Sequence, residues 1–321
     1  MNSPNLTASA AGITRRAFFA GALGLGATGL LAACGSGGDG GSGDTQPSGA
    51  AGGSEDQGLR VVALNTGQFE TCLALGALPV GIALASSVGT VSDGIPDFVK
   101  DRFGSQFDLD TVESVGERQA PDLEAVAALD PDLILSNKRA DPTLLDQLGQ
   151  LAEVVLSNGG SEEWKADLGV IGDALGVPDQ AEELLESYET RARDWAERRG
   201  SDGTVSLVRG KGDEYLMMGA RALASIVAVD SGLTRPENQT FDDAPGHDIS
   251  LENAADLDAD WLFYGFPQGA ADVTSSDSWT ALPVVQEGRA FEVEVDPWFL
   301  NASVVAADRV LDDMMELIGD A

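Results

Sequence analysis

Short apolar runs alternate with amphipathic stretches from residue 59 onward. The first apolar runs predict strands at 59–65 (LRVVALN), 80–84, 132–136 and 152–157. Helical patterns lie between them, at 68–75, from 122 onward and near 141–149. Strand, helix and strand with brief connections are typical of a parallel sheet covered by helices.

A second series of the same kind begins at residue 204. It predicts strands at 204–210, 261–265 and 290–295, followed by a long amphipathic helix from about 299 to 318. The pattern therefore predicts two α/β lobes with mainly parallel sheets, an N-terminal lobe at 59–178 and a C-terminal lobe at 201–321.

Residues 179–200 (DQAEELLESYETRARDWAERRG) lie between the two series and predict one continuous helix. Leu184, Tyr188 and Trp195 recur at helical spacing, and Glu189 with Arg193 is an i, i+4 pair. About 20 helical residues reach about 30 Å. A single helix of this length predicts lobes held at a nearly fixed separation, with a ligand cleft between them.

One stretch occurs twice. DLEAVAALDPDLIL at 122–135 is matched by SLENAADLDADWLF at 250–263. Both copies place a capping residue, Asp122 or Ser250, before Leu-Glu, both end in Leu-Asp-x-Asp, and both run into a strand. The matched pairs are Leu123/Leu251, Glu124/Glu252, Ala127/Ala255, Leu129/Leu257, Asp130/Asp258 and Asp132/Asp260. The match predicts equivalent units in the two lobes. The alternative is that helix-to-strand connections in general use similar residue types, which could also produce it.

The N-terminal residues 1–33 predict a targeting segment. Arg15 and Arg16 precede a short Gly/Ala/Leu-rich region that is too short to span a membrane, as in Tat-type signals. The region ends in LAAC, which resembles a bacterial lipobox and predicts lipidation at Cys34. Residues 34–58, which follow, hold no large apolar residue and predict a flexible Gly/Ser-rich tether.

The chain is strongly acidic, with a formal net charge of −34. Without Arg15 and Arg16, 17 basic residues stand against 53 acidic residues, a net charge of −36. Nucleic acid is excluded as a partner because binding it requires a basic footprint. We interpret this acidity as a solvated surface suited to a salty exterior.

Few residues offer metal or nucleophile chemistry. His247 is the only histidine, and Cys72 is the only cysteine besides Cys34, so no intramolecular disulfide is expected in the mature chain. The composition argues against a His-rich metal site and a Ser-His-Asp centre, and no G-x-S-x-G motif occurs. The sequence therefore indicates a binding protein rather than an enzyme.

Residues 115–137 (VGERQAPDLEAVAALDPDLILSN) resemble the segment that marks the iron-siderophore and cobalamin class of ABC-transporter substrate-binding proteins. The resemblance continues through ISLENAADLDADWLFYG and SWTALPVVQEGRAFEVEVDPWF. It implies two lobes joined by a rigid helix, a cleft that holds a chelate or corrin, and a monomeric, lipid-anchored receptor. Such a receptor lies on the outer face of the cytoplasmic membrane and delivers its cargo to an ABC permease.

Ligands of parallel sheets bind beyond the carboxyl ends of the strands, so the loops after strands supply the candidate contacts. The predicted ligand-binding residues are Asn65, Thr66, Glu117, Arg118, Asn137, Lys138, Arg209, Tyr215, Tyr264 and Trp298. Basic residues gather at these loops and predict a locally positive cleft. Two structural alternatives remain open: Arg118 and Arg209 could form ion pairs, and Trp298 could pack in the core.

The resemblance also implies one exposed glutamate per lobe that docks onto arginines of the permease. It assigns this role to Glu124 and Glu252. The structural alternative is that both glutamates only stabilise the starts of their helices.

The expected cargo is a ferric siderophore, with iron carried inside the chelate and no cofactor or metal ligand from the protein. Cobalamin or haem in the same fold is the main alternative, which the low aromatic content of 6% disfavours. A bare-metal receptor is disfavoured by the single histidine. A surface-tethered enzyme is the alternative from another class, and no nucleophile motif or cofactor loop supports it.

Overall fold

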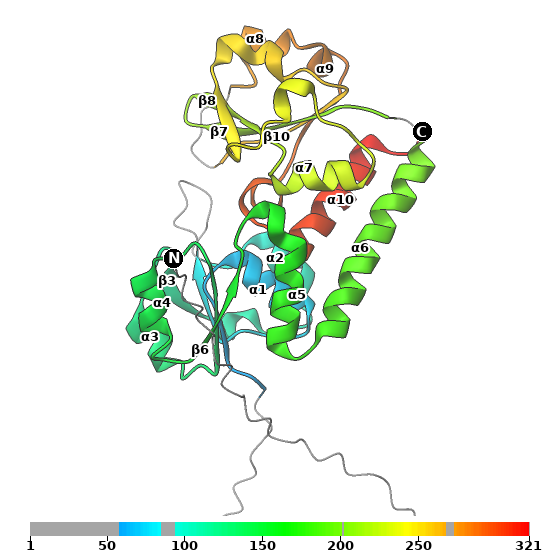
Figure 1. Cartoon of the computed structure of the whole chain (residues 1–321). Helices are drawn as coiled ribbons and strands as arrows, with labels where there is room; N and C mark the ends of the chain where they lie inside the picture. Colours follow the sequence, from blue (N-terminus) through cyan, green and yellow to red (C-terminus); the bar gives the residue numbers. More distant parts are fainter. Residues whose placement is uncertain (1–57, 85–93, 201, 268–272, 321) are drawn as a thin grey trace, which may run out of the picture. The chain divides into compact units, whose positions relative to one another are not determined.

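The computed structural model describes residues 58–84, 94–200, 202–267 and 273–320, all within one compact unit. This unit holds two β-sheets, each covered by helices, and a long helix α6 that connects them (Figure 1). The predicted signal peptide, Cys34 and nearly all of the tether lie outside the described residues. Within the described part of the chain, every helix is too short or too polar to cross a membrane.

The N-terminal sheet has six strands. In spatial order they are β4 (Ala120–Pro121), β3 (Glu113–Glu117), β2 (Gly81–Leu84), β1 (Val61–Ala63), β5 (Leu133–Asn137) and β6 (Glu153–Ser157). All neighbours pair in parallel except β3 and β4. The helices of this part are α1 (Thr66–Ala74), α2 (Asp97–Phe103), η1 (Leu109–Thr111), α3 (Leu123–Ala128), α4 (Pro142–Leu148), η2 (Ser161–Glu163) and α5 (Trp164–Leu175).

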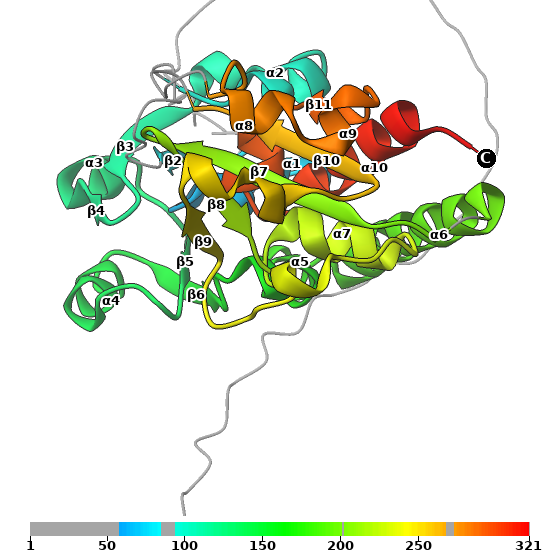
Figure 2. The ribbon, with the colours of Figure 1, turned by 90° about the horizontal axis from the view of Figure 1, so that it is seen from above.

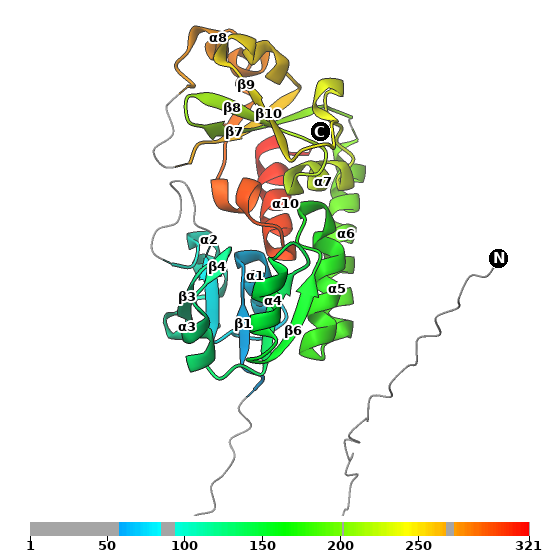
Figure 3. The ribbon, with the colours of Figure 1, turned by 60° about the vertical axis from the view of Figure 1, so that its left-hand side comes forward.

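Both faces of the N-terminal sheet are buried, which explains why its strands read as continuous apolar runs. Val61 and Ala63 of β1 face the core formed with α1 and α5, whereas Val62 points to the opposite core under α3 and α4. Figure 3 shows β1 and β6 with α1 and α5 beside them. The carboxyl ends of the parallel strands therefore meet at one edge of the sheet.

The C-terminal sheet has five strands, in the order β11 (Ala290–Glu292), β10 (Trp261–Gly265), β7 (Val205–Lys211), β8 (Glu214–Met218) and β9 (Gly246–Ile249). β10 pairs in parallel with β7 and β11, whereas β7, β8 and β9 pair antiparallel. This sheet is therefore mixed, and its antiparallel half is visible in Figure 2. The α/β class is confirmed, but the prediction of mainly parallel strands holds only for the N-terminal sheet.

Helices cover both faces of the C-terminal sheet (Figure 1). The helices of this part are α7 (Leu223–Asp230), η3 (Glu237–Gln239), η4 (Leu251–Leu257), α8 (Asp277–Thr280), α9 (Pro283–Gln286), η5 (Asp296–Leu300) and α10 (Val304–Ile318). One face packs against α7, η5 and α10, and the other packs against η4, α8 and α9.

The connecting helix α6 covers Pro178–Arg199, starts on a proline and ends at Gly200 in the left-handed conformation. It packs against α5, α7 and α10 through the buried Tyr188 and Trp195. The expected Glu189–Arg193 pair is not formed: Glu189 accepts instead from Lys165 at 3.1 Å. A packed helix of this length favours a fixed separation between the two sheets.

The closing helix is shorter than predicted. Residues 299–318 were expected as one helix, but a single wide turn, η5, ends at Leu300 and α10 begins at Val304. Ser303 causes the break, because its backbone is extended and its hydroxyl caps α10 by accepting from the Ala306 N–H at 3.0 Å. α10 then packs against α1, α6 and α7. One continuous core thus includes α1, α5, α6, α7 and α10.

The two copies of the repeated stretch fold differently at their starts. Asp122 caps α3 by accepting from the Glu124 and Ala125 N–H groups at 2.9 and 3.1 Å. The prediction that Ser250 does the same is wrong, because Ser250 makes no cap hydrogen bond and η4 is a kinked 3₁₀ segment. The helix starts are therefore not equivalent.

The ends of the two copies are equivalent. Asp132 Oδ2 accepts from the Arg60 N–H at 2.9 Å, and Asp260 Oδ2 accepts from the Thr204 N–H at 2.8 Å. Arg60 directly precedes β1 and Thr204 directly precedes β7. The last Asp of each Leu-Asp-x-Asp motif thus fixes the entry to the first strand of its sheet.

Candidate functional site

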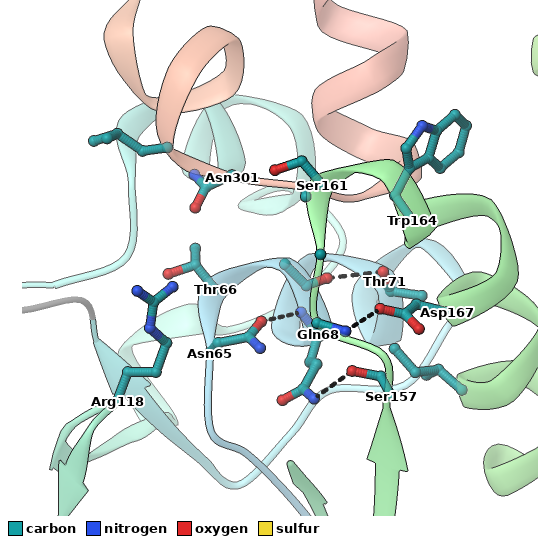
Figure 4. Close-up of a pocket in the computed structure, with 16 residues that line it drawn as sticks. Asn65, Thr66, Gln68, Thr71, Arg118, Ser157, Ser161, Trp164, Asp167 and Asn301 are labelled. Carbon is teal, nitrogen blue, oxygen red and sulfur yellow. Dashed lines mark hydrogen bonds between the residues drawn. The ribbon is translucent and has the colours of Figure 1, made fainter. Parts of the chain in front are cut away.

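A polar cavity lies at the carboxyl ends of the N-terminal strands, where β1 passes into α1 and β6 passes into η2. Its volume is ≈ 100 Å³, and Leu300 at the end of η5 closes it together with Asn301 and Ala302 of the connection to α10. Figure 4 shows Arg118 and Asn301 entering this cavity from different elements beside the first turn of α1. A depression of ≈ 460 Å³ adjoins it, shares Asn65, Arg118 and Gly159, and continues to Asn137 and Arg139. We call the cavity and the depression together the candidate site.

Asn65 shapes the floor of the candidate site. It follows Leu64 at the end of β1, and its Oδ1 accepts from the Gln68 N–H at 2.8 Å, which caps α1. This cap holds Thr66 and Gly67 at the cavity with their N–H groups in the first helical turn, where the helix dipole favours negative charge.

Gly67 allows the C-terminal segment to approach α1 closely. A Cβ at this position would lie 2.5 Å from the Ala302 carbonyl oxygen, so any larger residue would displace that backbone. The cavity therefore has a wall from each part of the chain, α1 on one side and Leu300–Ala302 on the other.

Three buried polar atoms at the cavity, Gln68 Oε1, Trp164 Nε1 and Asn301 Nδ2, have no hydrogen-bond partner among the described residues. Gln68 donates to the Ser136 carbonyl at 2.6 Å and to Ser157 Oγ at 3.2 Å, which leaves its Oε1 unpaired. The indole Nε1 of Trp164, which is 1% exposed, is unpaired as well. Buried polar groups are normally satisfied, so this lining is suited to water or to the polar surface of a ligand.

Most cationic side chains of the described residues have a hydrogen-bonding or ionic partner. Arg139 and Arg221 both contact Glu162 of η2, and Arg102 and Arg191 both contact Asp308. Among the lysine and arginine side chains of the described ranges, only those of Arg118, Arg193 and Arg209 make no hydrogen bond or ion pair with another described residue. The chain has 53 acidic residues, yet none of the described ones pairs with the side chains of these three arginines.

Arg118 and Arg209 differ from Arg193 in their positions. Arg118 lines both parts of the candidate site, and Arg193 lies on the exposed side of α6. Arg209 lines neither part; it is half-buried near the end of β7, its Nε is buried and unpaired, and burial lowers its pKa. A half-buried guanidinium without a carboxylate partner is costly, which makes Arg209 available to an anion. Arg118 is exposed and is available to an anion because it lines the cavity without a described partner for its side chain.

Comparisons with known proteins agree with this arrangement. The sequence profile of the family described as "Periplasmic binding protein" matches residues 61–296. This chain belongs to that family. Its members are binding proteins, so the prediction that the chain is not an enzyme is confirmed at the level of the family.

Individual relatives of this binding protein carry iron-related names. The chain is 32% identical over 273 residues to a probable siderophore-binding lipoprotein, YfiY, of Bacillus subtilis, covering 79% of this chain and 81% of the relative. It is 23% identical over 264 residues to the Fe(3+) dicitrate-binding periplasmic protein FecB of Escherichia coli, covering 80% and 84%.

A solved structure shares the fold of this binding protein. Staphylococcus aureus SirA complexed with staphyloferrin B matches with a TM-score of 0.68 at 24% identity, covering 81% of this chain and 92% of SirA. The resemblance predicted from residues 115–137 is thereby confirmed at the level of the family and the fold.

The structure brings only some of the predicted contacts together in this binding protein. Asn65, Thr66 and Arg118 line the cavity, and Asn137 lines the adjoining depression. Glu117 is exposed at the end of β3 and lines neither part. Lys138 is exposed, and its Nζ donates to Asn158 Oδ1 at 2.7 Å.

Two of the three aromatic predictions need correction, those of Tyr215 and Trp298. Tyr215 is 0% exposed, stacks on Trp279 at 5.5 Å and donates to the Val273 carbonyl at 3.2 Å. Tyr264 is half-buried against the same Trp279. Trp298 is 0% exposed, stacks on Phe263 at 4.7 Å and donates to Asp313 Oδ2 at 2.8 Å. Tyr215 and Trp298 are therefore core residues with satisfied polar atoms, and neither offers a surface to a ligand.

Trp164 and Asn301 were missed by sequence reasoning. Trp164 follows the Gly-rich connection after β6, a loop after a strand that could have been included. Asn301 could not be found, because an unbroken helix from 299 was expected across it. The predicted docking residues Glu124 and Glu252 are both exposed, at the starts of α3 and η4.

Proposed function

We propose that this protein captures a ferric siderophore outside the cytoplasmic membrane and delivers it to an ABC permease for iron uptake. Relatives named for siderophore and ferric citrate binding support this assignment. The observation that carries it on this chain is the unpaired Arg118 at a polar cavity, in a protein of net charge −34.

The chemistry of the candidate site suits an iron chelate rather than bare iron. Its lining offers the guanidinium of Arg118, the amide of Asn301, the indole N–H of Trp164 and the first turn of α1. These groups donate hydrogen bonds to oxygen atoms, whereas Fe(III) itself is a hard cation that takes oxygen ligands, here supplied by the chelator. An anionic chelate with carboxylate oxygens on its surface fits such donors best.

The delivery part of the proposal rests on exposed residues and on the N-terminal sequence. Glu124 and Glu252 are the proposed permease contacts, one beside each sheet. Cys34 is the proposed lipidation site, which would hold a monomeric receptor on the outer face of the membrane. The printed names of relatives include lipoproteins and periplasmic proteins.

Quenching of intrinsic tryptophan fluorescence tests the ligand, because Trp164 lines the cavity. The panel is ferric citrate, ferri-bacillibactin, iron-loaded staphyloferrin B, iron-loaded Desferal, cobalamin and haem. We expect saturable quenching by at least one anionic iron chelate and none by cobalamin or haem. Binding of cobalamin or haem alone would overturn the proposal.

Charge recognition is tested with matched arginine variants. Arg118→Ala or Arg209→Ala should weaken binding of an anionic chelate by about 1 to 3 kcal/mol, roughly 5-fold to 150-fold in Kd. Arg193→Ala is the control, since Arg193 is also unpaired but lies on α6 away from the candidate site. Unchanged affinity in both test variants would point to an uncharged cargo or a different site.

A further inference from the structure

Glu70 is a buried carboxyl group directly behind the candidate site. It lies on α1, is 0% exposed, and is surrounded by the apolar core that α1 shares with α5 and α10. Its Oε2 is hydrogen bonded to Ser303 Oγ, and its Oε1 has no partner among the described residues. Burial raises the pKa of Glu70 to about 8, although the Ser303 hydroxyl acts in the opposite direction. Burial therefore favours the protonated form of the side chain near neutral pH.

The partner of Glu70 controls one wall of the cavity. Ser303 caps α10 and directly follows Leu300, Asn301 and Ala302, which line the cavity. Glu70 is one turn after Thr66 and Gly67, which line the cavity from the other side. The hydrogen bond between Glu70 and Ser303 therefore joins the two walls just behind their ligand-facing residues, and the contact of Gly67 with the Ala302 carbonyl joins them at the front.

We propose that Glu70 is a positioning residue of the candidate site. While the carboxyl is protonated, the hydrogen bond that Ser303 donates to it holds the Leu300–Ala302 segment against the first turn of α1. Ionisation strengthens this one bond but leaves a buried charge whose Oε1 has no described partner, and the segment opens to admit water to that charge. The identity of the ligand rests on the proposed function, whereas the positioning of the segment by Glu70 does not.

Other charged groups near Glu70 would reinforce this behaviour. Asp296 of η5 faces it, and burial together with Asp97 of α2 raises the pKa of Asp296 to about 6. Arg102 of α2 favours the ionised form of Glu70, but its guanidinium is paired with Asp308 of α10 at 3.1 Å. The strands β1 and β2 and the helix α5 contribute apolar side chains to this core. An ionised Glu70 would thus lie close to a second carboxylate, with its nearest cation already paired.

Hydrogen exchange of the ligand-free protein tests the positioning directly. The backbone amides of residues 301–306 are compared in wild type and Glu70→Gln between about pH 6.5 and about pH 9.5. Gln keeps the shape and an acceptor for Ser303 but cannot ionise. We expect the protection of these amides in wild type to fall about tenfold relative to Glu70→Gln as the pH rises, because ionisation follows the carboxyl pKa. Identical protection profiles in the two proteins would overturn the proposal.

Binding of ferric citrate supplies the functional readout. Its Kd in wild type should rise about tenfold over the same pH range relative to Glu70→Gln, because the chelate's own titration affects both proteins equally. The Ser303→Ala variant should bind ferric citrate weakly at every pH, and its Kd should not show the rise with pH that wild type shows. A failure of ferric citrate to bind any of these proteins would count against the proposed function, while the exchange profiles still decide the role of Glu70.

Discussion

Replacing Glu70 by Gln should make the free energy of unfolding of this protein less sensitive to a rise in pH. The carboxyl has an ordinary pKa of 4.5 in an unfolded chain and a pKa of about 8 in the folded protein. Between these values the folded state binds a proton that the unfolded state has released, so the free energy of unfolding falls as the pH rises. Above about pH 8 both states are ionised and the loss is complete. Gln has no proton to lose, so the variant escapes this decline.

The size of the effect follows from the burial of Glu70. At about 1.4 kcal/mol per pH unit, the interval between 4.5 and about 8 corresponds to roughly 5 kcal/mol, of which roughly 3 kcal/mol has accrued at pH 7. The side chain is fully buried, so solvent screening does not reduce this value. The NH₂ group of Gln finds no hydrogen-bond acceptor at this position, and burying it adds a cost of about 1 to 3 kcal/mol that does not depend on pH. Domains are typically stable by about 5 to 15 kcal/mol, so the change is large enough to measure.

Denaturant unfolding of both proteins at several values between about pH 4.5 and about pH 8.5 measures this difference. The stability of Glu70→Gln relative to wild type should rise by roughly 3 kcal/mol or more across that range. Asp296 also titrates within it, but in both proteins, so its contribution largely cancels. Glu182→Gln on the exposed side of α6 is the control and should leave the profile unchanged. A difference that stays constant with pH would show that Glu70 is not held protonated.

Three further predictions concern the whole receptor. The double change Glu124→Ala, Glu252→Ala should abolish iron uptake in cells and leave the Kd for the chelate within about twofold. The control change of the exposed pair, Glu182→Ala, Glu183→Ala, should leave both uptake and Kd unchanged. Uptake that survives the first double change would remove the docking role. Cys34→Ser should release the protein from membranes, and partitioning into detergent together with wild type would place the anchor elsewhere. Scattering profiles of free and loaded protein should nearly superimpose, because α6 packs along a core that is continuous from α1 to α10, and a large fall in the radius of gyration on loading would contradict this.

The regular elements could be predicted from the sequence because their burial follows simple periods. The strands β1 and β5 have both faces buried and read as apolar runs, and α6 shows Tyr188 and Trp195 at helical spacing. The break before α10 was not predicted, because Asn301, Ala302 and Ser303 were counted into the amphipathic pattern of one long helix. Ser303 ends the pattern only through its extended backbone and its bond to Glu70, which is distant in the sequence.

The candidate site was predictable only as far as loop position determines it. Asn65, Thr66 and Arg118 follow strands of the parallel sheet and lie at the cavity, as the rule for such sheets requires. Tyr215 was misplaced because it was assigned to the loop after the strand predicted at 204–210, whereas it lies within the antiparallel strand β8 and stacks on Trp279. Trp298 was misplaced because the resemblance fixed a residue type at this joint but not the direction of its side chain.

The repeated stretch separates structural from candidate functional positions. Asp132 and Asp260 occupy equivalent places because each fixes the entry to the first strand of its sheet, so their match has a folding explanation. The same explanation fails for the glutamates. Glu124 lies in the first turn of a capped α-helix, where the helix dipole stabilises its negative charge. Glu252 lies at the start of a kinked 3₁₀ segment that has no side-chain cap. Neither carboxylate bonds to another described residue, and both are exposed. Local helix chemistry therefore accounts for Glu124 but not for Glu252, and the docking role of the pair stays a prediction that the double variant tests.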